Sequence, residues 1–213
     1  MSPLRSIEAR PAHPLLAELP EGTLRRLEIY AELLQKWQRA FNLIGDSTVD
    51  DLWVRHFADS LQVAEAVPQA RNWIDLGSGA GFPGLVTAIK YAAEPGPRVH
   101  LVESNCRKCA FLREAARETE APAIVHCGRI EEVLPTLNET IDAVSARALA
   151  PLPELLAYAQ KFLDQGSIGV FPKGKLISAE LTPSLTAGKY LITTMESKTC
   201  ASARLVLVKR RVE

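Results

Sequence analysis

A glycine-rich turn at residues 77–84 constrains the fold of this chain more than any other feature. Its four glycines, Gly77, Gly79, Gly81 and Gly84, follow a short apolar run and precede an apolar stretch with helical spacing. Glycine lets a backbone turn sharply and lets a ligand approach closely. A strand, a glycine turn and a helix are typical of the first βα unit of a doubly wound α/β fold, where ligands bind at the carboxyl ends of the strands. The sequence therefore predicts an α/β fold with a ligand site at this turn.

The glycine run fits two kinds of cofactor. Gly79, Gly81 and Gly84 match G-x-G-x-x-G, the dinucleotide-binding pattern. Counted from Asp75, the run reads Asp-x-Gly-x-Gly-x-Gly, which resembles motif I of S-adenosylmethionine methyltransferases. A dinucleotide places its pyrophosphate at free N–H groups of a helix N-terminus, and Pro83 removes one such group. Because Asp75 suits the sulfonium and ammonium of S-adenosylmethionine better than a pyrophosphate, the pattern favours S-adenosylmethionine.

From residue 73 onward, apolar segments of strand length alternate with segments of helical spacing, which predicts a mostly parallel sheet with an antiparallel edge. The expected strands are 74–76, 99–102, 123–126, 141–145, 167–171, 189–195 and 204–209, and the expected helices are 85–91, 106–118, 130–137 and 152–163.

The first part of the chain has a different pattern. Residues 1–20 contain four prolines and predict little regular structure, whereas apolar stripes in residues 23–41 and 52–64 predict two helices. We therefore expect a helical extension at 1–70, packed on an S-adenosylmethionine-binding domain at 71–213.

Composition excludes several classes of protein. The 213-residue chain has no apolar run near the about 18 residues of a membrane span, and its N-terminus lacks the apolar core of a signal peptide. Together with four scattered cysteines, this favours a reducing, cytoplasmic location. The net charge of zero argues weakly against nucleic acid as a partner. Basic clusters at 25–26, 36–39, 107–108, 173–175 and 209–211 become informative only if they converge on the cofactor site.

Two further segments are candidates for cofactor contacts. Glu103 ends the second predicted strand, at the place where an acidic residue, about 20 residues beyond the glycines, accepts hydrogen bonds from a ribose diol. Ile130 and Glu131 follow the third strand, where the loop flanks the adenine in S-adenosylmethionine folds. Acidic residues at a helix start are equally consistent with a purely structural role there.

Arg147 is the candidate catalytic residue. It lies in Ser-Ala-Arg-Ala after the fourth strand, at the mouth where a methyl acceptor would bind. Neither the Asn/Asp-Pro-Pro-aromatic motif of amino methylation nor the Pro-Cys nucleophile of pyrimidine methylation is present. A ring nitrogen with a free lone pair, such as guanine N7, therefore fits as acceptor. Arg147 could hydrogen-bond guanine O6, a phosphate or the cofactor carboxylate.

Other polar residues carry weaker signals. His56, on an amphipathic helix, could be a base or a ribose contact, but a structural hydrogen bond is the favoured interpretation. Cys106 and Cys109 form a lone C-x-x-C without a second pair, so we expect neither a metal site nor redox chemistry.

Taken in order, these motifs resemble the RsmG (GidB) family of 16S rRNA guanine-N7 methyltransferases. The resemblance runs from about Asn42 to Gly174 and is carried by Arg55-His56, Asp59-Ser60-Leu61, the glycine run with Phe-Pro-Gly, Val102-Glu103-Ser104, Lys108-x-x-Phe111-Leu112, the segment 128–132, Ser-Ala-Arg-Ala at 145–148 and Lys173-Gly174.

The resemblance implies a class I, Rossmann-like methyltransferase fold with a mostly parallel seven-stranded sheet. It implies S-adenosyl-L-methionine as cofactor, contacted at Gly77, Phe82, Ile130, Glu131 and Arg147. The glycine pattern and the ribose position add Gly79 and Glu103 to this set. The expected partner is 16S rRNA in the small ribosomal subunit, with no metal, no membrane contact and a monomeric chain.

Two alternatives remain open at this point. A nicotinamide-linked oxidoreductase would use the G-x-G-x-x-G reading, but no convincing residue for handling a hydride is found near the mouth. A non-catalytic ribosome-assembly module would retain the S-adenosylmethionine site without depending on methyl transfer.

Overall fold

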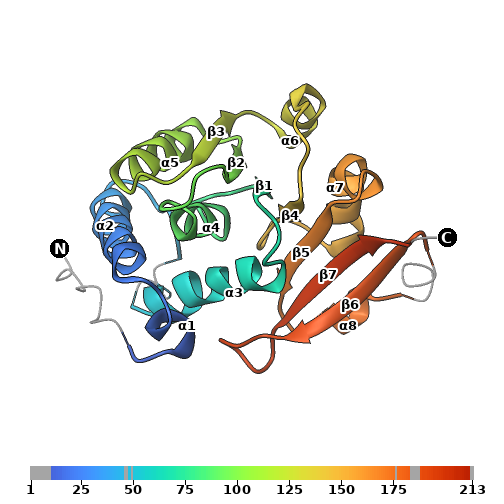
Figure 1. Ribbon diagram of the computed structural model, residues 1–213, viewed down its shortest axis with the longest axis horizontal. Helices are drawn as coiled ribbons and strands as arrows, with labels where there is room; N and C mark the ends of the chain where they lie inside the picture. Colours follow the sequence, from blue (N-terminus) through green and yellow to red (C-terminus); the bar gives the residue numbers. More distant parts are fainter. Residues whose placement is uncertain (1–10, 46–47, 49, 176, 183–187, 212–213) are drawn as a thin grey trace.

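The computed structural model describes residues 11–45, 48, 50–175, 177–182 and 188–211. A seven-stranded sheet with the order β3-β2-β1-β4-β5-β7-β6 forms its centre (Figure 1). The strands are β1 (Asn72–Leu76), β2 (Arg98–Glu103), β3 (Ala123–Cys127), β4 (Ala143–Ser145), β5 (Ile168–Lys173), β6 (Tyr190–Glu196) and β7 (Arg204–Arg210). Strands β1 to β5 are parallel, and β7 runs antiparallel to both β5 and β6. The predicted mostly parallel α/β sheet with an antiparallel component is therefore confirmed.

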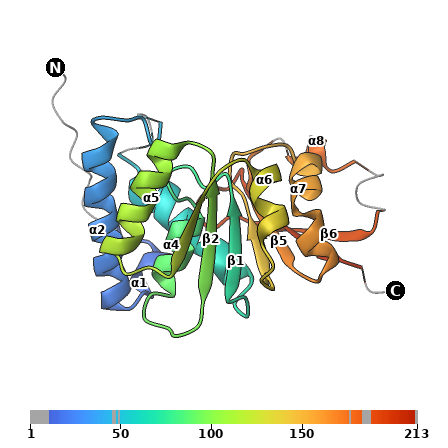
Figure 2. The same ribbon diagram turned by 90° about the horizontal axis from the view of Figure 1, so that it is seen from above.

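Alternate side chains along each strand supply two hydrophobic cores, one on each face of the sheet, as the two-residue period of a strand requires. Trp73 and Leu101 belong to one core, and their neighbours Ile74 and Val102 belong to the other. The first core is covered by α1 (Pro14–Ala17), α2 (Glu21–Gln38), η2 (Leu52–Ala58), α3 (Asp59–Ala66), α4 (Gly84–Lys90) and α5 (Cys106–Glu118). The second is covered by α6 (Ile130–Val133), the 3₁₀ turn η3 (Leu134–Thr136), α7 (Leu152–Asp164) and α8 (Ile177–Glu180). Figure 2 shows α4 and α5 beside β2 with α2 outside them, and α6 and α7 on the other side of β1.

The N-terminal helices pack directly against the glycine turn. The buried Tyr30 hydroxyl of α2 donates a hydrogen bond to the carbonyl of Ala80. The Arg26 side chain donates to the carbonyl of Thr119, beyond the end of α5, at 3.0 Å. These helices therefore share the core of the first sheet face, and the expected division of the chain at residue 70 stays a prediction.

Two local expectations in this region need correction. Residues 11–20 are not irregular throughout, because Leu15 and Leu16 of α1 are buried in the core; residues 1–10 lie outside the described part. The helix expected at 52–64 begins as a π-helix, η2, and continues as the α-helix α3. Such π-helical turns are rare and occur frequently at functional sites. None of the helices in the described ranges has the length and apolar character needed to span a bilayer.

Candidate functional site

The glycine turn between β1 and α4 presents its backbone to a pocket. Gly77 and Gly79 have φ angles of 64° and 58°, in the left-handed region that favours glycine. Ser78 donates its backbone N–H to the carbonyl of Val102 at 2.9 Å, which holds the turn against the end of β2. A Cβ built on Gly79 would meet no atom closer than the carbonyl oxygen of Gly77, at 3.8 Å. The space beside Gly79 is therefore open to a ligand.

Glu103 is fixed at the end of β2 by two backbone donors. Its Oε2 accepts from the N–H of Gly79 at 2.8 Å, and its Oε1 accepts from the N–H of Asn105 at 2.7 Å. Asn105 in turn caps α5 by accepting from two backbone N–H groups of its first turn, which sets the chain direction after β2. A carboxylate has about four acceptor sites, so Glu103 keeps lone pairs for a diol.

A cavity of ≈ 350 Å³, within the size range of small-molecule sites, opens between these elements. It is lined by Gly77, Gly79, Val102, Glu103, Ser104, Lys108, Gly128, Arg129, Ile130, Glu131, Arg147, Ala148, Leu149 and Tyr158. Every predicted cofactor residue except Phe82 lies on this lining. Tyr158 was not predicted, because it comes from the middle of α7 and carries no motif. Its hydroxyl donates to Glu154 at 3.0 Å.

Asp75 occupies a different position from the one expected. Its side chain is fully buried beneath the turn and is absent from the cavity lining. Ser145 donates to its Oδ1 at 2.7 Å. Burial raises the pKa of Asp75 to about 6, against the effect of this hydrogen bond. A direct contact between Asp75 and a cofactor cation is therefore not supported. The buried Asp75 side chain also explains why residue 84 is a glycine, because a Cβ added there would lie 2.5 Å from the Cβ of Asp75.

The Arg147 guanidinium lies over the ring of Phe82, 5.1 Å from its centroid. Its Nη2 donates to Nδ1 of His56 at 2.7 Å, and its Nη1 lies 3.2 Å from Oδ2 of Asp59. Burial, then the charges of Arg147 and Arg55, lower the pKa of His56 to about 3. His56 is therefore neutral and accepts this hydrogen bond through Nδ1. Phe82 does not line the cavity, and it contacts the site through the Arg147 guanidinium.

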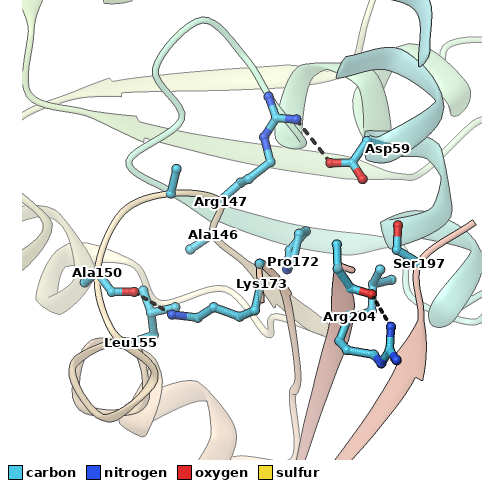
Figure 3. Close-up of a pocket in the computed structure, with 13 residues that line it drawn as sticks. Asp59, Ala146, Arg147, Ala150, Leu155, Pro172, Lys173, Ser197 and Arg204 are labelled. Carbon is cyan, nitrogen blue, oxygen red and sulfur yellow. Dashed lines mark hydrogen bonds and ion pairs between the residues drawn. The ribbon is translucent and has the colours of Figure 1, made fainter. Parts of the chain in front are cut away.

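A second cavity, of ≈ 270 Å³, also has Arg147 on its lining (Figure 3). It shares Arg147 and Ala148 with the first and is otherwise lined by Asp59, Ala146, Ala150, Leu155, Pro172, Lys173, Gly174, Ser197, Ala203, Arg204 and Leu205. Figure 3 shows Arg147 facing Asp59, and Lys173 extended toward the carbonyl of Ala150, to which it donates at 2.8 Å. The two cavities therefore adjoin at Arg147 and Ala148.

Two of the five basic clusters reach these cavities, and those at 25–26, 36–39 and 209–211 do not. Lys108 lines the first cavity and Lys173 lines the second. Lys209, Arg210 and Arg211 line a separate hollow with Asp164 instead. Together the two linings hold five basic side chains, Lys108, Arg129, Arg147, Lys173 and Arg204, against the carboxylates of Asp59, Glu103 and Glu131, and Lys173 also pairs with Glu180 at 2.9 Å.

The cysteines are arranged differently from the C-x-x-C pattern. The Sγ atoms of Cys106 and Cys127 lie 3.2 Å apart, whereas Cys109 is buried and donates to the carbonyl of Glu103 at 3.1 Å. Within the described residues, no group of three or more His, Cys, Asp or Glu side chains could hold a metal ion.

Solved structures with a similar fold include an O-methyltransferase. The O-methyltransferase TomG from Streptomyces achromogenes, determined with SAM, is 15% identical with a TM-score of 0.60 over 91% of this chain and 92% of that one. Rv0187 from MTB, determined with its cofactor, is 17% identical with a TM-score of 0.59, over 88% and 91% of the two chains. This likeness gives the chain the class I methyltransferase fold.

Sequence comparison is more specific. A protein from Methylobacterium sp. (strain 4-46) is 48% identical over 193 residues, 90% of this chain and 91% of its own length. Another from Methylobacterium radiotolerans is 48% identical over 192 residues, 90% of each chain. Both are named ribosomal RNA small subunit methyltransferase G. The family model GidB, described as rRNA small subunit methyltransferase G, matches residues 23–204. The predicted resemblance is thus confirmed, and the chain belongs to the GidB family of rRNA small subunit methyltransferases G.

Proposed function

We propose that this chain transfers a methyl group from S-adenosyl-L-methionine to N7 of a guanine in the 16S rRNA of the small ribosomal subunit. The observation that carries the proposal is the pair of adjacent cavities that share Arg147. One cavity has the glycine turn and the fixed carboxylate of Glu103, and the other has Lys173 and Arg204 at its wall. Family membership favours a methyltransferase over the nicotinamide-linked alternative.

In this proposal the first cavity holds the cofactor, which supplies an electrophilic methyl group on its sulfonium. Glu103 accepts hydrogen bonds from the ribose hydroxyls, while its two backbone donors keep it in place. Gly79 leaves room for the cofactor at the turn, whereas Gly77 accommodates the Leu149 side chain of the cavity lining, which a Cβ there would meet at 2.7 Å. Ile130 and Glu131 flank the adenine side of the cavity.

The second cavity then receives the acceptor base, and its cations meet the RNA phosphates. Guanine N7 carries a free lone pair, so the reaction needs alignment rather than a general base. His56 is consistent with this, because it is held as a neutral hydrogen-bond acceptor. Arg147, between the two cavities, orients the acceptor and supplies positive charge. We further propose that the chain acts as a monomer without a metal, in the cytoplasm where ribosomal subunits are assembled.

Transfer of tritium from labelled S-adenosyl-L-methionine to small ribosomal subunits from a strain lacking the gene tests this function. We expect incorporation into 16S rRNA by the wild type and none by Gly79→Ala. Binding of the cofactor without incorporation into subunits or 16S rRNA would instead support the non-catalytic assembly module.

A further inference from the structure

The Arg147 side chain is held by one short segment of the N-terminal helices. Its Nη1 donates to the carbonyl of Arg55 at 3.0 Å and to Oδ2 of Asp59 at 3.2 Å, and its Nη2 donates to Nδ1 of His56 at 2.7 Å. These partners fall in residues 55–59, where the π-helix η2 passes into α3. The arginine, in contrast, follows β4, about 90 residues later in the chain. A segment distant in the sequence therefore sets the direction of this guanidinium.

Asp59 is itself held from the opposite side. Its Oδ1 accepts from the hydroxyl of Thr199 and from Nε2 of Gln62, each at 2.7 Å. Gln62 also accepts from the backbone N–H of Lys198 at 2.9 Å. Thus the connection between β6 and β7 fixes one carboxylate oxygen and leaves Oδ2 for Arg147. Both carboxylate oxygens are therefore engaged, one by the β6–β7 connection and α3 and the other by the arginine.

His56 completes the arrangement through packing as well as hydrogen bonding. Its ring lies 4.7 Å from the ring of Phe82, centroid to centroid, and Phe82 also carries the guanidinium on its face. The Arg147 side chain is only 19% exposed and that of Asp59 17%. When side chains are largely shielded from solvent in this way, charge-assisted hydrogen bonds between them are strong and directional.

From this geometry we propose that Asp59 and His56 are positioning residues that hold Arg147 where the cofactor cavity and the acceptor cavity meet. The N-terminal helices thereby complete the catalytic site rather than only covering the sheet. The kinetic part of this inference rests on the proposed function, whereas the structural part concerns the mobility of one side chain.

Asp59→Asn is the direct test. The amide keeps the shape of the side chain, and its Oδ1 can still accept from Thr199 and Gln62. Its Nδ2 then faces Arg147, so a donor opposes a donor. We expect the single-turnover rate of methyl transfer to fall by about 10-fold to 100-fold, the range for loss of a charged hydrogen bond, with little change in cofactor affinity or melting temperature.

Glu65→Gln is the matched control. Glu65 lies on the same helix and pairs with Lys198 of the same β6–β7 connection at 2.8 Å, but it does not touch Arg147. We expect its rate to equal that of the wild type.

A second pair of variants, both at His56, covers the case in which Asp59→Asn fails to fold. His56→Asn places an acceptor where Nδ1 lies and should retain most of the rate, whereas His56→Leu removes it and should lose about 10-fold.

Side-chain NMR of Arg147 gives a result that does not depend on activity. A guanidinium held on both Nη atoms rotates slowly, so we expect resolved Nη signals in the wild type and in Glu65→Gln, and averaged signals in Asp59→Asn. Averaged signals in the wild type, or equal rates for Asp59→Asn and Glu65→Gln, would overturn the inference. Absence of methyl transfer by the wild type would reject the proposed function, and the NMR comparison would still decide whether Arg147 is held.

Discussion

The backbone N–H of Gly79 donates to Oε2 of Glu103 at 2.8 Å and so joins the turn after β1 to the end of β2. This bond makes the two predicted cofactor residues a single unit. The carboxylate orients the turn, and the turn holds the carboxylate with its remaining lone pairs toward the cavity. A change at either residue should therefore weaken the cofactor site.

Gly79→Ala should abolish measurable binding of S-adenosyl-L-methionine, and so should Gly77→Ala, whose methyl group would push against the Leu149 side chain of the cavity lining. At φ of 58° an alanine costs about 1–2 kcal/mol, and its methyl group enters the space beside the turn. Calorimetry with S-adenosyl-L-methionine measures the effect. Gly96→Ala is the control, because Gly96 also has a positive φ, 102°, but nothing lies within 4 Å of its Cβ position. Equal affinities for the three variants and the wild type would reject the assignment of the turn.

Glu103→Gln should weaken cofactor binding by about 1–3 kcal/mol, the range for a hydrogen bond to a charged group. The amide loses the negative charge, and its NH₂ must face the N–H of Gly79 or that of Asn105. Glu114→Gln, on the outer part of α5 where Glu114 pairs with Lys36, is the control. A dissociation constant unchanged from the wild type would place Glu103 outside the ligand site.

Arg147→Lys should lose most of the methyl-transfer activity, by about 10-fold or more. A lysine ammonium cannot reproduce the planar fork that reaches His56, Asp59 and the Arg55 carbonyl at once. Single-turnover rates with saturating cofactor measure this loss. Arg113→Lys, at an exposed hydrogen bond of α5, should retain full activity. Wild-type rates in Arg147→Lys would mean that only its charge matters.

The stability of the protein should depend on His56 at mildly acidic pH. Because the pKa of His56 falls from 6.5 to about 3 on folding, the unfolded chain takes up a proton below pH 6.5 while the folded protein does not. This contribution to stability is present above pH 6.5 and is lost as the pH falls, by about 2 kcal/mol at pH 5. Asp75 has the opposite effect on stability. Because its pKa is raised to about 6 in the folded protein, the folded protein takes up this proton before the unfolded chain does, and stability rises as the pH falls.

Urea unfolding at pH 7.5 and pH 5 therefore has to compare the wild type with His56→Asn, so that the contribution of Asp75 cancels. We expect the wild type to lose about 2 kcal/mol more than the variant between the two pH values. The same pH dependence in both proteins would mean that His56 is not held neutral in the folded state.

The sequence predicted the site residues whose type is dictated by the local backbone or by their place at the end of a strand. The glycine turn could be predicted because a left-handed backbone favours glycine, and Glu103 could be predicted because it ends a strand. The burial of Asp75 was not visible, because it depends on Ser145 and on the close approach of Gly84. Local patterns carry no record of such contacts between distant segments.

The environment of Arg147 was hidden for the same reason. Its partners come from residues 55–59, and these are held in turn by residues 197–199. No spacing within a single helix or strand links the three segments. Likewise, Cys106 meets Cys127 rather than Cys109, because the parallel pairing of β2 with β3 brings Cys127 beside Glu103.

The proposed reaction is tested most directly by mapping N7-methylguanine in 16S rRNA. Borohydride and aniline cleave RNA at this modification, so it appears as a defined break in the strand. In a bacterial strain lacking the gene, we expect the wild-type chain to restore one cleavage site and Gly79→Ala to leave it absent. The same cleavage pattern with and without the wild-type chain, or a methyl group found on another atom, would contradict transfer to guanine N7.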